Sequence, residues 1–458
     1  MKLIFRPIYW SYRASGGLWY WARRRFTKGG AATVVALFVT GAVGVDIENT
    51  VTYQAFALLL ALLLFSFFFS FRFSGKFSAT RRLPRIGTAG QPMFYKIVVK
   101  NLTAQNELSL TVLEDLADPR PSFEEWLAYN RAEDRRVGPA FLVSKRGRKQ
   151  RNPFRLANVK DAELPPLPAH GEAEASGEIF PLRRGVLRLQ GVTVARPDPF
   201  GLYRSFLKIP APQTVLILPR RYALPSIALP GAMRYQEGGV ALAANVGSSD
   251  EFVALRDYRH GDPLRHIHWR SWAKTGKPIV KEFEDEFFVR HALVLDTFDE
   301  EPNSEVLEEA VSVAASFACT ILTQESLLDL LFVGNQSYCF TAGRGVAHAD
   351  QMLEILASVK NCPDKPFVAL ENLVLNHIGV VSGCICVLQR WDDARRKFVA
   401  KLKAVGVPLL VLIVVPSGGG TISGAGGNFT DAEGTVHVLE VGKIEEGLAK
   451  LNGLTSDK

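Results

Sequence analysis

The stretch EFVALRDYRHGDPLRHIHWRSWAKTGKPIVKEFEDE, Glu251–Glu286, is the densest grouping of Arg, Asp, His and Trp residues in the chain. Gly261 can adopt a positive φ without steric penalty, and Asp262 is kept out of the helical region because Pro263 follows it. Asp is a preferred N-cap and Pro is favoured at the first helical position. Gly276 has the properties of a helix C-cap. The stretch therefore predicts a short helix over residues 263–275.

The side chains of this predicted helix separate into two faces. The first has the i, i+3, i+7, i+8 spacing of a packed face and consists of Leu264, Ile267, Ser271 and Trp272. The second is basic and consists of His266, Arg270 and Lys274. Residues 252–256 and 278–283 have the composition of short strands. The unit is therefore expected to run strand, tight turn, charged helix, strand.

The run DYRHGDPLRHIHWRSWAKTGKPIVKEF closely resembles the signature of a bacterial family, domain-of-unknown-function family 58. The matching positions are Arg256, Tyr258, Arg259, Gly261, Asp262, Arg265, Ile267, Trp269, Ala273 and Lys274. Trp272 stands where the family more often has Ser or Thr. The resemblance implies that a von Willebrand factor A-like domain follows the signature.

Residues 291–458 alternate between short apolar strands and helices, which predicts a mostly parallel sheet covered on both faces. The strands are expected at 292–296, 327–333, 337–341, 383–388 and 409–415, and the helices at 304–324, 346–359, 392–405 and 443–451. This Rossmann-type α/β pattern is what a von Willebrand A-like domain requires.

Residues 76–222 alternate apolar and polar side chains with a period of two, as in FYKIVVKNL at 94–102. Strands at this spacing, separated by Gly, Pro and Asn, predict an Ig-like β-sandwich. An insertion near 120–170 interrupts it, and residues 123–135 are expected to form a short helix. PDPFGL, at 197–202, resembles the end of this domain in the family.

Two long apolar runs precede the β-domain, at 29–45 and 51–71. The second has 21 residues, which is enough to cross a bilayer, and the first has 17. A linker of five residues joins them, so residues 29–71 are predicted to form a transmembrane helical hairpin. The chain is thus expected to be membrane-anchored and multidomain.

Charge predicts the orientation of this hairpin. Residues 1–28 carry seven basic side chains, residues 72–85 carry five, and neither segment contains an acid, whereas the linker carries two acids. Basic flanks stay on the cytoplasmic side, so both termini and the soluble domains should be cytoplasmic at a bacterial inner membrane. The net charge of the two basic segments and the linker together is +10, and that of the whole chain is +8, so the rest of the chain has a net charge of −2. The basic excess therefore predicts contact with anionic lipid and not with nucleic acid.

A metal or cofactor site is not expected. Von Willebrand A domains bind a divalent cation through D-x-S-x-S after the first strand, and the matching residues here begin at Asp296. Phe298 and Glu300 occupy the two serine positions, and Phe cannot coordinate a cation. Asp296 is therefore interpreted as a degenerate remnant. The three His residues near the signature lack the four ligands that structural zinc sites use.

Two interpretations of the function follow. In the first, the protein is a membrane-anchored, cytoplasm-facing interaction scaffold or adaptor, and the resemblance implies a MoxR-type AAA+ ATPase as its partner. The alternative is a membrane-surface enzyme that uses the Arg/Asp/His signature as its site. The sequence offers no activated nucleophile and no complete metal site, which favours the scaffold.

The signature lies in residues 223–290, where the pattern changes from all-β to alternating α and β. This position predicts a structural junction between the two domains. The acids Asp257 and Asp262 have Arg256, Arg259 and Arg265 nearby and can form an ion-pair network with them. Arg265 lies one turn before Trp269, on which its guanidinium could stack. The basic face that includes Arg270 is predicted to be the docking surface.

Overall fold

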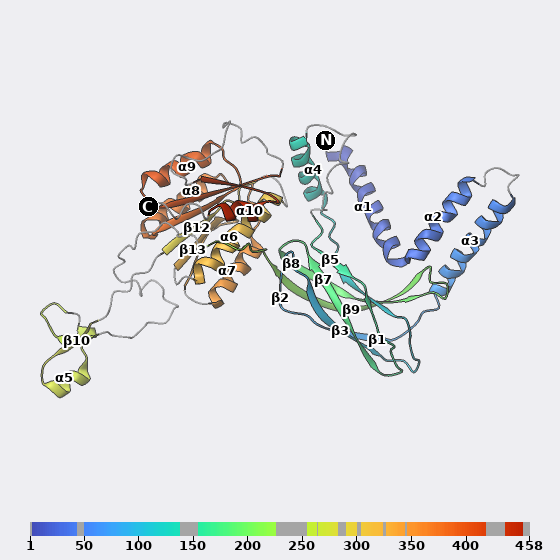
Figure 1. The fold of residues 1–458 in the computed structure, drawn as a ribbon, viewed down its shortest axis with the longest axis horizontal. Coiled ribbons are helices and arrows are strands. Elements are labelled where there is room, and N and C mark those ends of the chain that lie inside the picture. The colour runs from blue at the N-terminus through green and yellow to red at the C-terminus, as the bar shows by residue number, and fades with distance from the viewer. Residues whose placement is uncertain are drawn as a thin grey trace. The chain divides into compact units, whose positions relative to one another are not determined.

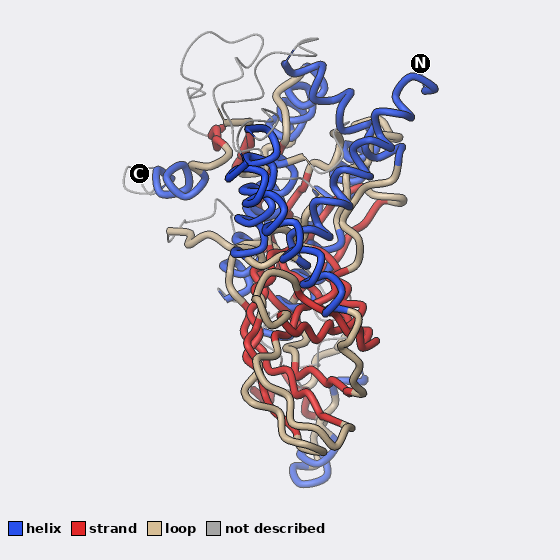
Figure 2. Tube along the Cα trace, turned by 90° about the vertical axis from the view of Figure 1, so that its right-hand side faces the viewer, coloured by secondary structure: helices blue, strands red, loops and turns tan. Residues whose placement is uncertain are grey.

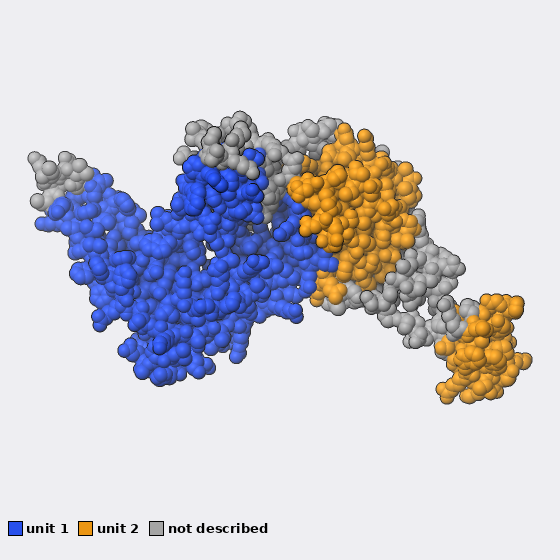
Figure 3. All heavy atoms as spheres, turned by 180° about the vertical axis from the view of Figure 1, so that it is seen from behind, with its two compact units in different colours: residues 1–221, 299–312, 353–361 blue, residues 222–298, 313–352, 362–458 orange. Residues whose placement is uncertain are grey.

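The computed structural model describes residues 2–43, 50–137, 154–225, 254–262, 264–282, 290–299, 304–323, 327–343, 346–417 and 436–451. Helices and strands are mixed along this part of the chain (Figure 2). It divides into two compact units (Figure 3). Unit 1 comprises residues 1–221, 299–312 and 353–361, and unit 2 comprises residues 222–298, 313–352 and 362–458. The acids of the linker after residue 45 and Glu300 lie outside the described residues.

Three helices begin unit 1 (Figure 1): α1 (Lys2–Arg25), α2 (Lys28–Val43) and α3 (Thr50–Ser70). By length and composition, one helix of the described chain could cross a membrane, over Val51–Ser70. The 16 residues of α2 are apolar but shorter than a full span, since they extend over about 24 Å of a core of about 30 Å. Residues 1–28, predicted only as a basic segment, form a helix over most of their length.

Two sheets follow these helices in unit 1. The first has the order β1 (Phe77–Arg82), β3 (Met93–Asn101), β7 (Glu172–Pro181), β5 (Ala157–Lys160). The second has the order β2 (Ile86–Thr88), β9 (Arg204–Leu218), β8 (Gly185–Pro197), β4 (Thr111–Leu116), β6 (Ala162–Glu163). Alternate side chains of β3 are buried, as the period of two predicts. Ile97 and Ile179 from the first sheet and Val192 and Val194 from the second belong to one hydrophobic cluster.

The predicted helix within the insertion is present as α4 (Phe123–Val137). Ser122 begins it as a capping box, in which the Glu125 carboxylate accepts hydrogen bonds from the Ser122 N–H and hydroxyl at 2.9 and 3.0 Å. Tyr9 of α1 packs against this helix, with its ring 5.4 Å from that of Phe123 and 5.7 Å from that of Trp126. The insertion therefore provides a surface on which α1 rests.

Unit 2 contains a six-stranded sheet. Its order is β14 (Ser337–Ala342), β13 (Leu327–Val333), β12 (Arg290–Leu295), β15 (Gly383–Leu388), β16 (Leu409–Val415), β17 (Val436–Glu440). All neighbours pair in parallel except β13 and β14. The hairpin between β13 and β14 is too short for a crossover, so β14 must run antiparallel. This edge strand is the exception to the predicted parallel sheet.

Helices alternate with the strands of this region, as the pattern predicts. They are α6 (Glu305–Thr323), α7 (Val346–Ser358), α8 (Val368–His377), α9 (Asp393–Ala404) and α10 (Ile444–Ala449). Phe367 at the start of α8 and Phe398 of α9 pack in one cluster with Val294 and Val411 of the sheet. Helix α8 and strand β17 were not predicted from the sequence. The sheet places the ends of β12 and β15 side by side, which positions the polar residues that follow them.

Candidate functional site

The signature forms a β-hairpin with helical turns between its strands. Strands β10 (Ala254–Asp257) and β11 (Ile279–Glu282) pair antiparallel, with Arg256 opposite Val280. Between them lie a 3₁₀ turn over Leu264–His266 and helix α5 (Trp269–Thr275). Both predicted strands are therefore present within the described residues.

The prediction of one continuous helix from residue 263 is wrong. Ile267 is almost fully buried and forms an isolated bridge with Val280, and the N–H of His268 donates to Ile279 O at 2.8 Å. This pairing holds the chain extended at Ile267, so α5 starts only at Trp269. The predicted end of the helix is confirmed: Gly276 has a φ of 71° and its N–H donates to Trp272 O.

Asp262 does not act as the predicted helix cap. Its carboxylate binds the Arg256 guanidinium through two contacts, of 2.7 and 2.8 Å, and accepts a hydrogen bond from the Arg259 N–H at 2.8 Å. Such two-point pairing of Arg with a carboxylate fixes orientation as well as distance. Gly261 allows the tight turn, with a φ of 108°. Asp262 therefore ties the loop back onto strand β10.

We expect the pKa of Asp262 to reveal this pairing. The hydrogen bonds from Arg256 and then from the Arg259 N–H lower that pKa from 3.8 to about 2. A lowered acid pKa means that the pair stabilises the hairpin above pH 3.8 and is lost as the pH falls through about 2. Arg256→Ala should return the pKa toward 3.8, measured by NMR titration of the Asp side chains. Arg259→Ala is the control: it keeps the backbone N–H that binds Asp262, so the Asp262 pKa should stay close to its lowered value. An Asp262 pKa near 3.8 in the parent protein would contradict the pairing.

The remaining signature residues form an exposed surface on the hairpin. Trp269 is 64% exposed, and its ring stacks on that of Trp272 with centroids 5.2 Å apart. Arg270, Ala273 and Lys274 of α5 are exposed. Asp257 and Arg259 are also exposed, and Tyr258 is half-buried. The side chain of Arg265 lies outside the described ones, so its stacking on Trp269 stays a prediction.

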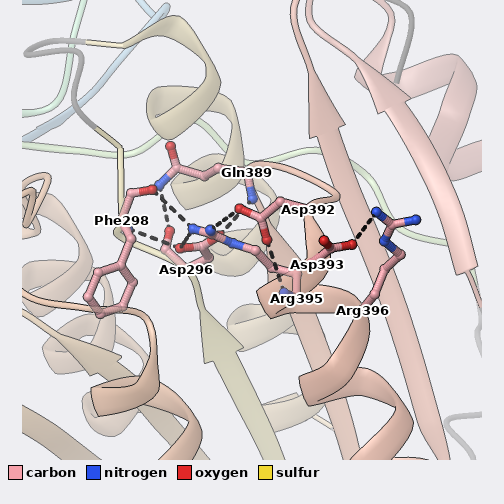
Figure 4. Close-up of polar contacts among 7 residues, drawn as sticks. All are labelled: Asp296, Phe298, Gln389, Asp392, Asp393, Arg395 and Arg396. Atoms are coloured by element: carbon pink, nitrogen blue, oxygen red, sulfur yellow. Dashed lines mark hydrogen bonds and ion pairs between the residues drawn. The ribbon is translucent and has the colours of Figure 1, made fainter. Parts of the chain in front are cut away.

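A second polar site lies at the carboxyl ends of β12 and β15 (Figure 4). Asp296 directly follows β12 and Gln389 directly follows β15. The chain leaves β12 toward β13 on one side of the sheet and leaves β15 toward β16 on the other. Open α/β sheets bind ligands at such a switch point. This is therefore the position at which a ligand or cation would be sought first.

Asp296 is fully buried at this position, and its carboxylate oxygens accept four hydrogen bonds. The Arg395 guanidinium donates from Nε at 3.1 Å and from Nη2 at 3.2 Å. The backbone N–H groups of Phe298 and Gln389 donate at 3.0 and 3.2 Å. A guanidinium therefore supplies the positive charge next to this carboxylate, where a cation would otherwise stand.

Arg395 is held by more than its partner carboxylate. Asp392, the N-cap of α9, accepts from the Arg395 N–H, and its other oxygen lies 2.5 Å from Arg395 Nη1. The guanidinium also donates to Phe298 O and lies 4.4 Å above the Phe367 ring. Burial by itself would lower the pKa of Arg395, but the charges and hydrogen bonds of Asp296 and Asp392 together outweigh it and leave that pKa raised. The site is thus closed by its own side chains.

A buried acid also lies near the amino ends of β12 and β13, and the sequence did not single it out. Asp329 is fully buried, and Arg290 Nε and His377 Nε2 lie 2.6 and 2.7 Å from its Oδ2. The Thr341 hydroxyl donates to Oδ1 at 2.7 Å. Burial raises the pKa of Asp329, but these hydrogen bonds outweigh it and the pKa is lowered. The carboxylate therefore stays ionised and joins three strands to the end of α8.

Arg395 is the other functional-site residue that sequence reasoning missed. The available signal was WDDARR at 391–396, in which an N-capping Asp precedes an Arg by three residues. Within the described residues, no group of three or more His, Cys, Asp or Glu side chains is placed to hold a metal ion. Phe298 lies in the hydrophobic cluster, with its ring 5.7 Å from that of Phe367.

Comparisons with known proteins agree with the resemblance of the signature. The uncharacterized protein YeaD of Bacillus subtilis (strain 168) is 27% identical over 186 residues, which cover 40% of this chain and 44% of that protein. The chain thus spans less than half the length of this relative. A cohesin module from a Clostridium perfringens ATCC13124 family 33 glycoside hydrolase matches 31% of this chain and 98% of its own. Its identity is 11% and its TM-score 0.16, too low to support a statement about fold. Residues 254–388, which begin at strand β10 and end with β15, match the family model described as "Protein of unknown function DUF58".

Proposed function

We propose that this protein is a membrane-anchored, cytoplasm-facing interaction scaffold, and that its signature hairpin docks a protein partner. The observation that carries the proposal is the exposed surface of α5. It presents a stacked tryptophan pair beside the basic side chains of Arg270 and Lys274. Trp and Arg are the residue types that most often dominate the energy of protein interfaces. The resemblance to family 58 suggests a MoxR-type AAA+ ATPase as the partner.

The closed switch point supports binding over catalysis. Asp296 is the residue best placed for chemistry in an α/β sheet, and Arg395 already neutralises it. The strand order, with one antiparallel edge strand, supports a von Willebrand A-like domain. A domain of this kind without a cation site can still bind protein. Two mainly antiparallel sheets around a shared cluster likewise support an Ig-like β-sandwich in residues 76–222.

The membrane part of the proposal rests on charge and length. Helix α3 can cross a bilayer by length and composition, and α2 is taken as its shorter partner in a transmembrane hairpin. The basic segments 1–28 and 72–85 favour cytoplasmic termini, in the bacterial inner membrane. The soluble domains then face the cytoplasm, where an AAA+ ATPase works.

A charge reversal on α5 tests the docking surface. Arg270→Glu should leave the melting temperature unchanged, because Arg270 is exposed, and should abolish co-purification of the ATPase with the full-length protein from native membranes. The measurement is mass spectrometry of the purified complexes. Lys397→Glu, at an exposed position of α9, is the matched control and should retain the partner.

Two outcomes contradict the proposal. If Arg270→Glu still co-purifies with the ATPase, α5 is not the docking surface. If no ATPase co-purifies with the parent protein, a MoxR-type ATPase is not the partner. A hydrolytic or transfer activity of the purified parent that Arg270→Glu abolishes would instead support the alternative, a membrane-surface enzyme with the signature as its site.

A further inference from the structure

We infer that α1 is an interfacial helix, which lies in the surface of an anionic bilayer and holds the β-domain against it. The inference rests on the membrane anchoring proposed above and adds a second, in-plane contact with lipid. Three observations within unit 1 carry it: the two faces of α1, the charge of its flanks, and the turn that joins it to α2 and α3.

One face of α1 is occupied by protein. Tyr9 is buried, and its hydroxyl donates to Pro121 O at 2.9 Å. One turn further along, Arg120 donates to Arg13 O at 3.1 Å. Near the end of the helix, Arg24 Nη1 lies 2.6 Å from Asp115 Oδ1 of β4. These contacts fix the rotation of α1 about its axis.

The opposite face is mainly apolar and exposed up to Leu18; nearer the end of the helix, the Trp21 ring lies 6.4 Å from that of Tyr203 and Arg25 donates to Arg204 O. Trp10, Leu18 and Trp21 are 66%, 67% and 45% exposed. At 100° per residue these three residues and Trp19, which is 73% exposed, fall within one half of the helix, and Leu18, near the middle of that half, points directly away from Tyr9. Large apolar side chains gathered on one exposed face mark a surface that is covered by something else. Trp is the residue type that accumulates at the level of lipid headgroups.

The charge of α1 indicates that an anionic bilayer covers this exposed face. Residues 1–28 carry seven basic side chains and no acid. Arg6, Arg23 and Lys28 are exposed along the helix and at its end. Basic side chains near an anionic membrane surface are attracted to the lipid headgroups. An apolar face beside such a basic fringe is the pattern of a helix that lies in the interface.

The turn at residues 198–203 places α1 at the membrane boundary. Asp198 accepts hydrogen bonds from the N–H groups of Phe200, Leu202 and Tyr203 at 3.0, 2.7 and 2.7 Å. Its Oδ2 also accepts from the hydroxyl of Ser66, which is fully buried near the end of α3, at 2.8 Å. Through Asp198, the PDPFGL motif is therefore hydrogen-bonded to α3, the helix that can cross the bilayer.

The same turn also contacts the residues that connect α1 to α2. The Thr27 N–H donates to Leu202 O at 3.1 Å, and the Phe26 ring lies 5.2 Å from that of Tyr203. A Cβ atom at Gly30 would stand 1.9 Å from Leu202 O, so only glycine allows α2 to approach this closely. The end of α1, the start of α2 and the end of α3 thus meet at one turn, where the hydrocarbon of the membrane would end.

Quenching of tryptophan fluorescence by brominated lipids tests the inference on the full-length protein. Nanodiscs would be made of phosphatidylcholine and phosphatidylglycerol, with bromine either near the headgroup or near the bilayer centre. We expect headgroup-proximal bromine to quench the parent more strongly than central bromine. Trp10→Phe and Trp21→Phe should each remove part of that quenching.

Two controls make the outcome specific. Trp126→Phe, on the protein side of α1, and Trp269→Phe, exposed on the signature hairpin, should leave the quenching unchanged. Leu58→Trp adds a reporter at an exposed position of α3 and should be quenched by central bromine. If Leu58→Trp is quenched but neither Trp10→Phe nor Trp21→Phe reduces the quenching, α1 does not lie in the bilayer surface, and the membrane anchoring through α3 still stands. Absence of quenching at Leu58→Trp overturns the membrane anchoring itself.

Discussion

Replacing Arg395 with alanine is expected to lower the free energy of unfolding by about 3–5 kcal/mol. The change leaves the Asp296 carboxylate without its cation in a fully buried position. It also removes the donor to Phe298 O and the partner of Asp392 at the start of α9. Removing one member of a buried pair costs far more than the pair itself contributes, since the other charge stays desolvated.

The neighbouring residue supplies the control for this prediction. Arg396 also pairs with an Asp three residues before it, at 2.5 Å from Asp393, but the two side chains are 43% and 82% exposed. Arg396→Ala should therefore change stability by about 1 kcal/mol or less. Limited proteolysis across a urea gradient measures both midpoints on the solubilised full-length protein. Equal midpoints for the two variants would mean that the Asp296–Arg395 pair does not stabilise the carboxyl ends of β12 and β15.

Arg81→Ala is expected to have an effect of the same size in the β-domain, about 3–5 kcal/mol. Arg81 and Glu114 are 1% and 2% exposed, and they join β1 of one sheet to β4 of the other through a contact of 2.9 Å. Arg81 also donates to the carbonyls of Gly191 and Ala211, both at 2.6 Å. Glu114 further accepts from the Tyr95 hydroxyl at 2.9 Å. The variant therefore leaves an acid and two carbonyl groups without this donor inside the core.

The size of this loss should depend on pH. Burial raises the pKa of Glu114, and Arg81 opposes that rise, so the pKa should rise further in Arg81→Ala. A raised acid pKa favours the folded state at low pH, and this stability is lost as the pH rises through the folded pKa. The loss caused by Arg81→Ala should thus shrink on acidification. Lys96→Ala is the control, because its pair with Glu174 is exposed; a loss for Arg81→Ala that stays constant with pH would contradict the role of Glu114.

Local patterns in the sequence were enough to predict much of the secondary structure. A period of two placed β3, and alternation of apolar strands with helices placed most of the sheet in unit 2. The long apolar run gave α3, and glycine at position 276 ended α5 where expected. These features depend on the solvation and backbone preferences of neighbouring residues, which the sequence contains directly.

Tertiary structure alone decided which polar groups pair and where the signature helix begins. Asp262 binds Arg256 and is not the N-cap of α5, because Ile267 pairs with Val280 and α5 begins only at Trp269. Arg395 turns inward and Arg396 outward, although both follow an Asp by three residues. Arg81 and Glu114, 33 positions apart, meet only because two sheets pack together. Such pairings follow from the desolvation of charges during packing, and packing depends on residues far apart along the chain.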